Sequence, residues 1–414
     1  MADVSLSLDA APPDLSAQLQ ELGYCVIEGA AGAEWLARLR KEAQAVDARG
    51  SLEPSLNKLA TAGSGGKSTQ GALCAKRGVR EAAVMLEGAL TPPDTFADGA
   101  PFAASPTLAE LATSCAPELV RSLNAAAPWL ALNRVDTIKV QVNDGAGGCF
   151  PMHFDTTPQT SRRLTAILYL GEEWTPPHGG ELRIYPCARR PPPTAHRLPL
   201  RRPHRPCRMS TLPTGPVRPR RFPLAPVDVA PRAGTLVLFS SVSSLHRVMP
   251  AYARRVAISI WLSGQSAEPR FPSAYPAWVG KDEASSLAFL RTSSNVAALT
   301  KVLYSQEWAA STEDAFGAGP DVRRARDPSR RDPRERRVRP ARRMRTRAHG
   351  ASALTSHSLW CAQVKAALEL HHQEAARLEA QMPAPLLALL RSTLPLHPPP
   401  PEEEAEEGDL GALF

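Results

Sequence analysis

Two short segments typical of β-strands carry two histidines and an aspartate, and these three residues constrain this chain more than any other feature. His153-Phe-Asp155 places an imidazole and a carboxylate two residues apart, so that on a strand both project from the same face. A second histidine, His246, follows the apolar run 234–239. Two neutral imidazoles and one carboxylate form the facial triad that holds non-heme Fe(II) and leaves coordination positions open. We therefore predict His153, Asp155 and His246 as metal ligands and as the catalytic centre.

An arginine follows the second histidine at a distance that fits an anion-binding role. Arg255 stands nine residues after His246, inside the strand-like run 253–261. A guanidinium there could take the far carboxylate of 2-oxoglutarate in a bidentate contact. The adjacent Arg254 competes for this role, but period-two alternation sends the two side chains to opposite faces of a strand. The nine-residue spacing favours Arg255 as the cosubstrate-binding residue.

These residues lie in a stretch, about 135 to 262, that resembles the catalytic core of 2-oxoglutarate/Fe(II)-dependent dioxygenases, in particular the prolyl 4-hydroxylase type. The segment 246–255, His-Arg-Val-Met-Pro-Ala-Tyr-Ala-Arg-Arg, resembles the one that joins the family's distal histidine to its oxoglutarate arginine. The segment 164–170 resembles the strand after the first two ligands. The segment 179–186 resembles the next strand, with paired glycines at its entry.

The resemblance implies further residues and cofactors of the site. It implies Fe(II) as metal, 2-oxoglutarate as cosubstrate and L-ascorbate beside them. It also implies that Tyr169 points at the oxoglutarate, and Thr165 is a candidate to line the same pocket. A tyrosine or a threonine in a barrel strand is also common as an ordinary core or strand residue. One position departs from the family: Asn143 stands where many relatives carry a tyrosine, ten residues before His153.

The activity that the resemblance implies is that of a dioxygenase, an oxidoreductase that hydroxylates a prolyl residue or a related substrate with release of succinate and CO2. The substrate is then a protein, a peptide or a small molecule, because the fold alone does not fix it. Two alternatives remain: a catalytically inactive β-barrel that acts as a binding module, and a cupin-like metalloprotein that does not use 2-oxoglutarate. The intact ligands argue against the first, and the second has no need of Arg255. The sequence sets no oligomeric state.

The pattern of strands predicts a mainly β fold with flanking helices, built on a double-stranded β-helix, or jelly-roll, core. Between 135 and 261, strand-like runs alternate with turn signals and no helical period intervenes. Helical periods lie at 13–22, 33–46, 108–126, 284–304 and 358–382. We expect five regions: an N-terminal support region 1–134, the dioxygenase core 135–265, a support region 266–321, an arginine-rich segment 322–350, and a helix with an acidic tail 351–414.

The basic charge of the chain is confined to two low-complexity segments. The segment 187–224 holds ten arginines, ten prolines and no acidic residue, and 322–347 holds thirteen arginines against three acidic residues. Each segment carries +10, so against a total of +8 the rest carries −12. Three interpretations compete: solvated insertion, an arginine-rich arm for nucleic acid or acidic membranes, and translated non-coding sequence. Because the segments lack aromatic residues interleaved among the arginines to stack on single-stranded bases, we disfavour nucleic-acid binding.

Cysteine usage and hydropathy bear on the compartment. Seven cysteines are scattered without a C-x-x-C pair, which favours free thiols in a reducing compartment over a disulfide framework. The first nine residues lack the basic and apolar regions of a secretory signal, and no run approaches the ~18 apolar residues of a membrane span. We expect a soluble intracellular protein without membrane attachment, located in the cytoplasm or the nucleus.

Overall fold

The computed structural model describes residues 5–185, 226–264, 302–317 and 350–384, except 60, 63–67, 70–72, 86–95, 97–99, 157–160, 172, 243 and 382–383. Its α-helices are α1 (Leu15–Glu21), α2 (Ala33–Ala48), α3 (Pro106–Glu110), α4 (Ala116–Ala126), α7 (Ser305–Phe316) and α9 (Gly350–Gln381). A π-helical turn, Leu111–Cys115, joins α3 to α4, and 3-10 turns lie at Pro128–Leu130 and Pro176–His178.

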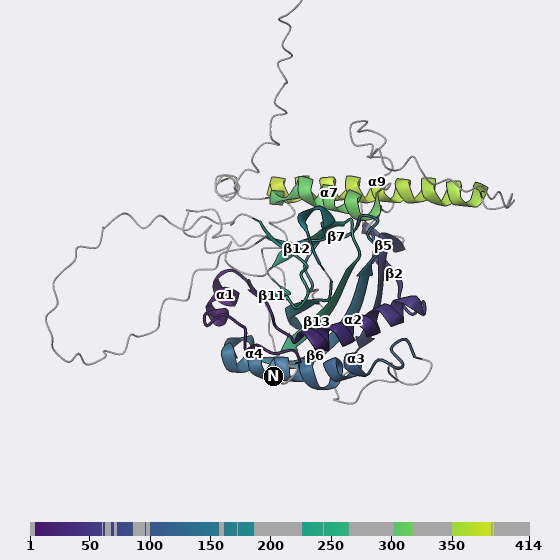
Figure 1. Cartoon of the computed structure of the whole chain (residues 1–414). Coiled ribbons are helices and arrows are strands. Elements are labelled where there is room, and N and C mark those ends of the chain that lie inside the picture. Colours follow the sequence, from purple (N-terminus) through teal and green to yellow (C-terminus); the bar gives the residue numbers. More distant parts are fainter. Residues whose placement is uncertain are drawn as a thin grey trace, which may run out of the picture.

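Thirteen strands of the described residues form two main sheets and a short hairpin. They are β1 (Tyr24–Ile27), β2 (Glu53–Lys58), β3 (Thr61–Ala62), β4 (Ser68–Thr69), β5 (Leu73–Met85), β6 (Leu132–Asn143), β7 (Gly148–His153), β8 (Arg162–Tyr169), β9 (Leu182–Tyr185), β10 (Val227–Val229), β11 (Leu236–Ser240), β12 (Leu245–Ala251) and β13 (Arg255–Gly264). The large sheet has the order β1-β11-β8-β13-β6-β5-β2, and the small sheet has the order β10-β9-β12-β7. All of these pairings are antiparallel. The predicted jelly-roll core with flanking helices is thereby confirmed (Figure 1).

Alternation along the strands of the large sheet separates a core face from a cavity face. On β13, Val256, Ile258, Ile260 and Leu262 join the core beneath the helices, whereas Arg255, Ser259 and Trp261 line a cavity between the sheets. β6 repeats this pattern, with Ile138, Val140 and Val142 in the core and Thr137, Lys139 and Gln141 on the cavity wall. Successive side chains of a strand point to opposite faces, so polar side chains at every second position can line a site without disturbing the core.

The N-terminal helices cover the outer face of the large sheet (Figure 1). α2 buries Trp35, Leu36, Leu39, Ala43 and Val46, the helical face that the sequence predicts. The predicted helix 108–126 is divided, because the π-helical turn at Leu111–Cys115 interrupts it between α3 and α4. The N-terminal support region adds β1, β2 and β5 to the large sheet.

The C-terminal helices pack on a different part of the barrel. α7 lies against β7 and β12 of the small sheet and against β5, and α9 runs alongside α7 (Figure 1). The Ser311 hydroxyl of α7 accepts a hydrogen bond from the Met152 amide at 3.0 Å, directly before the first predicted metal ligand. The predicted helix 284–304 lies almost wholly outside the described residues, and the arginine-rich segments 187–224 and 322–347 lie outside them entirely.

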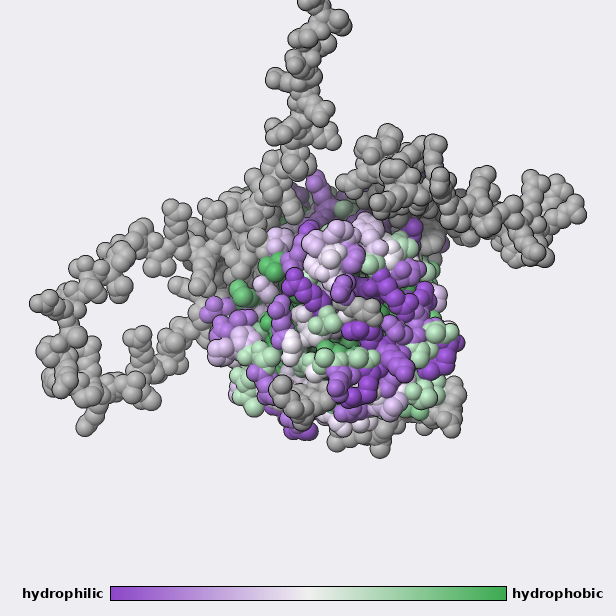
Figure 2. All heavy atoms as spheres, viewed as in Figure 1, coloured by the Kyte–Doolittle hydropathy of each residue, from purple (hydrophilic) through white to green (hydrophobic). Residues whose placement is uncertain are grey.

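The surface view in Figure 2 shows a mainly hydrophilic face with small hydrophobic patches between the polar residues. The longest described helix, α9, does not have the length of apolar sequence that crossing a lipid bilayer requires, and neither does any other described helix.

Candidate metal centre

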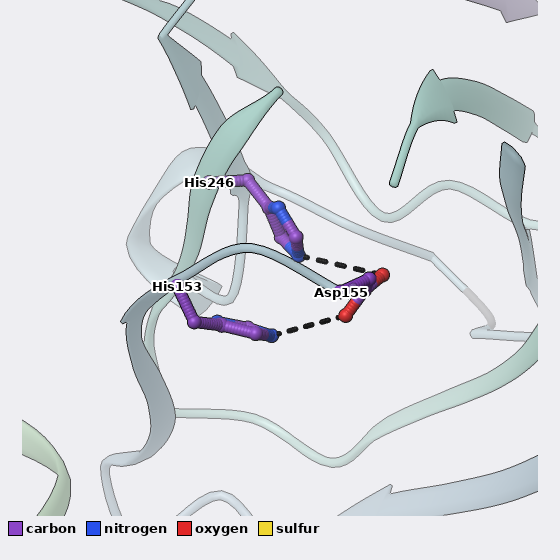
Figure 3. Close-up of side chains that lie close together, drawn as sticks. All are labelled: His153, Asp155 and His246. Carbon is purple, nitrogen blue, oxygen red and sulfur yellow. Dashed lines mark ion pairs between the residues drawn. The ribbon is translucent and has the colours of Figure 1, made fainter. Parts of the chain in front are cut away.

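The two histidines of the predicted triad face each other across a strand pair. His153 ends β7 and His246 lies near the start of β12, and their Cα atoms are direct partners in the antiparallel register. Their ring centroids lie 4.3 Å apart. Asp155, two residues beyond β7, turns back toward both rings (Figure 3). One donor atom from each of the three residues lies within 4.8 Å of the others, so the structure brings the predicted ligands together.

Backbone carbonyls orient both imidazoles for metal binding. The Nδ1 atom of His153 lies 2.7 Å from the Pro151 carbonyl oxygen, and that of His246 lies 3.0 Å from the Ser244 carbonyl oxygen. Only a protonated Nδ1 can donate to a carbonyl, so each ring presents the lone pair of Nε2 to the centre. Burial lowers the pKa of His246 to about 4, which keeps this imidazole in the neutral, metal-binding form at neutral pH.

Asp155 completes the donor set as a carboxylate. Its Oδ1 lies 3.3 Å from Nε2 of His153 and its Oδ2 lies 3.8 Å from Nε2 of His246 (Figure 3). Burial raises the pKa of Asp155, but the two imidazoles and a hydrogen bond from Thr165 outweigh this effect and hold it well below the usual range. Two imidazoles and an ionised carboxylate form the donor set of a facial triad and fit Fe(II).

Thr165 supports the metal ligand directly. Its hydroxyl donates to Oδ2 of Asp155 at 2.7 Å and lies 2.8 Å from the Ser241 hydroxyl. The sequence suggested Thr165 as a cosubstrate-binding residue, and a role toward the cosubstrate remains a prediction. Ser241 escaped the sequence analysis, because only the pairing of β8 with β11 brings it to Thr165.

Arg255 and Tyr169 present unsatisfied polar atoms beside this centre. Arg255 is 4% exposed and lines the cavity that holds the triad, and its Cζ lies 5.0 Å from the centroid of the Tyr169 ring. Among the described residues, Nε and Nη1 of Arg255 and the hydroxyl of Tyr169 have no hydrogen-bond partner. Burial raises the pKa of Tyr169 despite the guanidinium beside it, so the phenol stays a donor. Buried donors without partners are costly, and a carboxylate would satisfy all three.

The neighbouring arginine faces away, as alternation along the strand predicts. The side chain of Arg254 is 44% exposed and its Nη2 lies 2.7 Å from Oδ2 of Asp47 on α2. Asn143, the departure from the family pattern, is the direct cross-strand partner of Arg255. It donates through Nδ2 to the Gly148 carbonyl oxygen at 3.0 Å, and its Oδ1 is buried without a partner among the described residues.

The paired glycines before β9 allow Arg255 to occupy its place. Gly180 has a φ of +76°, which favours glycine, and a Cβ there would approach Cδ of Arg255 to 3.0 Å. Gly179 has a φ of +62°, and a Cβ there would lie 2.2 Å from the Pro250 carbonyl oxygen. The close approach of these backbones explains the glycine pair noted in the sequence.

The cavity at the triad has a volume of about 460 Å³ and extends well beyond the metal ligands and Arg255. Its other polar lining residues include Lys76, Glu81, Lys139 and Gln141 from β5 and β6. None of these four was predicted from the sequence. Lys139 and Gln141 share a face of β6 with Asn143, and this alternation is the signal that could have found them.

Comparisons with known proteins agree with this site. Residues 138–263 match the family described as the 2OG-Fe(II) oxygenase superfamily. Over 124 residues, 30% of this chain, the sequence is 28% identical to the hypoxia-inducible factor prolyl hydroxylase of Caenorhabditis elegans, and the match spans 12% of that relative's length. A prolyl 4-hydroxylase structure from Phytophthora capsici matches with a TM-score of 0.50 and 22% identity, covering 89% of this chain and 92% of that chain. The structural likeness shows the fold.

The family match over residues 138–263 and the His-Asp-His donor set indicate a 2OG-Fe(II) oxygenase domain, of the dioxygenase class of oxidoreductases, and the jelly-roll agrees with it. The resemblance inferred for 135–262 is thereby confirmed, including its prolyl-hydroxylase relatives.

Proposed function

We propose that the protein is an active Fe(II)- and 2-oxoglutarate-dependent dioxygenase that hydroxylates a prolyl residue or a related substrate, with release of succinate and CO2. One observation carries the proposal: a complete His-Asp-His triad and an arginine with unsatisfied buried donors line the same cavity. A metal site that did not use 2-oxoglutarate would gain nothing from a buried guanidinium without a partner, because such a group costs free energy.

Each residue has a distinct role in this proposal. His153, Asp155 and His246 hold the iron, which supplies the oxidative chemistry when it is bound. Arg255 pairs with the far carboxylate of 2-oxoglutarate, and the Tyr169 hydroxyl donates to the same carboxylate. Thr165 keeps Asp155 ionised and oriented. Ile167 and Leu182 also line the cavity, and their apolar side chains exclude water from the cosubstrate.

The test is Fe(II)-dependent release of succinate from 2-oxoglutarate, first without any substrate and then with proline-containing peptides and free amino acids. We expect slow release without substrate, stimulated by the correct substrate and abolished by a chelator. Iron binding without succinate release, and without an effect of 2-oxoglutarate on the site, would favour the cupin-like metalloprotein. Absence of iron binding would favour the inactive binding module.

The substrate class and the compartment belong to this proposal as well. The relative's name, a prolyl hydroxylase of hypoxia-inducible factor, supports a prolyl residue of a protein or peptide as substrate. None of the described cysteines, Cys25, Cys74, Cys115 and Cys149, is in a disulfide, which supports a location in the cytoplasm or nucleus. L-ascorbate remains a prediction, to be tested by adding it to the same assay.

A further inference from the structure

The cavity wall carries a cation that neither the iron site nor the cosubstrate explains. Besides Arg255, the positively charged lining residues are Lys76, Lys139 and Arg162. Arg162 is neutralised by Asp136, with Nε 2.7 Å from Oδ2. Lys139 is neutralised by Glu81, with Nζ 3.0 Å from Oε2. Lys76 forms no ion pair with any carboxylate of the described residues.

Lys76 is held by neutral groups and keeps one donor unused. The residue is 6% exposed, and its Nζ donates to the Ser55 hydroxyl and to Oδ1 of Asn57, both at 2.8 Å. An ammonium group has three donors, so one N–H remains in a residue that lines the cavity. Burial lowers the pKa of Lys76 to about 8, so the side chain is mostly charged at neutral pH.

A purely structural tie between β5 and β2 would not need a charge. A neutral donor could bridge Ser55 and Asn57, whereas a buried ammonium without a counterion is unfavourable. Groups with such perturbed pKa values cluster at functional sites, and an anionic ligand would supply the missing counterion. The cosubstrate is not that ligand, because the iron and Arg255 account for its two carboxylates in the proposed function.

The surroundings of Lys76 keep a net positive charge, which favours an anion. Its Nζ lies 4.8 Å from the centroid of the Phe150 ring, and the Nζ of Lys139 lies 6.0 Å from the same centroid. Two ammonium groups therefore flank one aromatic ring of the cavity wall. Glu81 offsets one of these two charges, so the group retains a net positive charge.

We propose that Lys76, with Lys139 beside it, binds a carboxylate of the substrate, so that the substrate of this cavity is an acid. The proposal rests on the dioxygenase function proposed above and adds the substrate's chemical class to it. The carboxylate has two sources: the α-carboxylate of a free amino acid, or an Asp or Glu side chain next to the reacting residue of a peptide.

Matched acid and amide probes test the proposal. One pair is N-acetyl-L-proline and N-acetyl-L-prolinamide, and the other is the end-blocked peptide Ala-Leu-Pro-Glu-Ala and its Gln counterpart. Affinity is measured by calorimetry under argon on the enzyme loaded with Fe(II) and 2-oxoglutarate. We expect the acid of at least one pair to bind about tenfold or more tightly than its amide, the range of a charge-assisted hydrogen bond. The pair that responds identifies the source of the carboxylate.

Variants connect the preference to Lys76. The ratio of acid to amide affinity should fall close to one in Lys76→Met and should persist in Lys76→Arg, which keeps the charge. Lys41→Met, which removes an exposed lysine of α2, is the matched control and should keep the ratio of the wild type. The ratio of acid to amide affinity, taken within one protein, does not change when a variant loses affinity for both probes equally. If Lys76→Met does not fold, the proposal is tested by the ratio of acid to amide affinity in the wild type and in Lys76→Arg.

Two results would overturn the proposal. One is equal affinity of the wild type for acid and amide in both pairs, including no binding of either. The other is a preference for the acid that survives in Lys76→Met. Failure of the dioxygenase function is separate, since it would remove Fe(II)-dependent succinate release measured without any probe.

Discussion

The two sheets of the jelly-roll contribute different chemistry to the same cavity. The small sheet supplies the metal centre from two adjacent strands, with His153 and His246 as a direct cross-strand pair. The large sheet supplies the charged residues proposed to bind organic ligands, spread over several strands that line the cavity, with Arg255 on β13, Lys139 on β6 and Lys76 on β5. Metal coordination needs a few donor atoms within a few ångströms of each other, whereas binding of an organic ligand needs side chains spread over a whole cavity surface.

This difference decides what a mutation can do in each sheet. Loss of one metal donor removes a third of the protein's ligand set, and nothing nearby can replace it. Loss of one wall residue weakens the binding of one ligand and leaves the iron in place. The expected effect of a mutation therefore decreases from the small sheet to the large sheet, and then to the contacts between and beyond them.

The largest effect is expected in the small sheet. His153→Ala, Asp155→Ala and His246→Ala should each abolish Fe(II)-dependent succinate release, because an incomplete facial triad holds Fe(II) poorly. Bound iron and succinate release are measured on the same samples. His372→Ala, an exposed histidine of α9, is the control and should keep both. Activity retained in His246→Ala would reject this residue as the distal ligand.

The large sheet should respond in the binding of 2-oxoglutarate. Arg255→Ala should weaken it by on the order of 2–5 kcal/mol, the cost of removing one partner of a buried charge pair. Arg254→Ala should leave it unchanged, because that side chain pairs with Asp47 on the outside. The KM for 2-oxoglutarate and the affinity for Fe(II) are measured for both variants. An effect of Arg254→Ala alone would contradict the assignment, and no effect of either would favour the cupin-like alternative.

The same difference explains how far the sequence could predict the molecule. The grouping of the three predicted metal ligands was predictable because they stand in or beside short, apolar, strand-like segments at recognisable spacing. The strand β2 at the edge of the large sheet and its neighbour β5 were not, because Glu53–Lys58 and much of Leu73–Met85 lack apolar alternation and become strands by pairing with each other and with β6. Lys76 went unnoticed with them. The hydrogen bond from Thr165 to Asp155 depends on the position of β8 relative to the end of β7. The spacing of residues along the sequence does not give that position.

The cost of burying the charged form of Lys76 should appear in how the free energy of unfolding depends on pH. The pKa of this lysine falls from 10.5 to about 8 on folding, so between these values the unfolded chain binds more protons and the free energy of unfolding rises with pH. The full penalty, roughly 3 kcal/mol at 1.36 kcal/mol per pKa unit, is present below pH 8 and disappears toward pH 10.5.

The measurement is urea unfolding of the wild type and Lys76→Met across this pH range. The wild type should gain stability relative to the variant as the pH rises, and Lys41→Met should show no such gain relative to the wild type. A constant difference between wild type and Lys76→Met would show that the lysine is not buried as a charge.

Thr165 connects the two sheets, and its removal should give a smaller effect that falls on the metal. Thr165→Val keeps the shape but loses the hydrogen bond to Asp155, so the affinity for Fe(II) should fall by about 10–100-fold, as for other groups that hold a metal ligand. At saturating iron the KM for 2-oxoglutarate should be unchanged. A raised KM with normal iron affinity would instead support the cosubstrate role suggested by the sequence. Thr165→Ser, which keeps the hydroxyl, is the control.

The smallest effect is expected from the arginine- and proline-rich segment 187–224. It connects β9 to β10, which pair directly, with Ile184 opposite Val227. Replacing the segment by Gly-Gly leaves a short connection of the length that joins antiparallel strands in hairpins. Shortening a loop changes its closure entropy by only about 0.6 kcal/mol per halving, so the barrel should stay folded with its iron and 2-oxoglutarate affinities intact.

The shortened protein separates the metal centre from substrate recognition. Succinate release without substrate depends on the iron and cosubstrate sites alone, so it should match the wild type. If that release persists while stimulation by the substrate is lost, the segment belongs to substrate binding. If soluble protein or iron is lost, the segment supports the small sheet itself, and its interpretation as an insertion or as translated non-coding sequence is wrong. Thermal unfolding and iron content, measured before turnover, distinguish these outcomes.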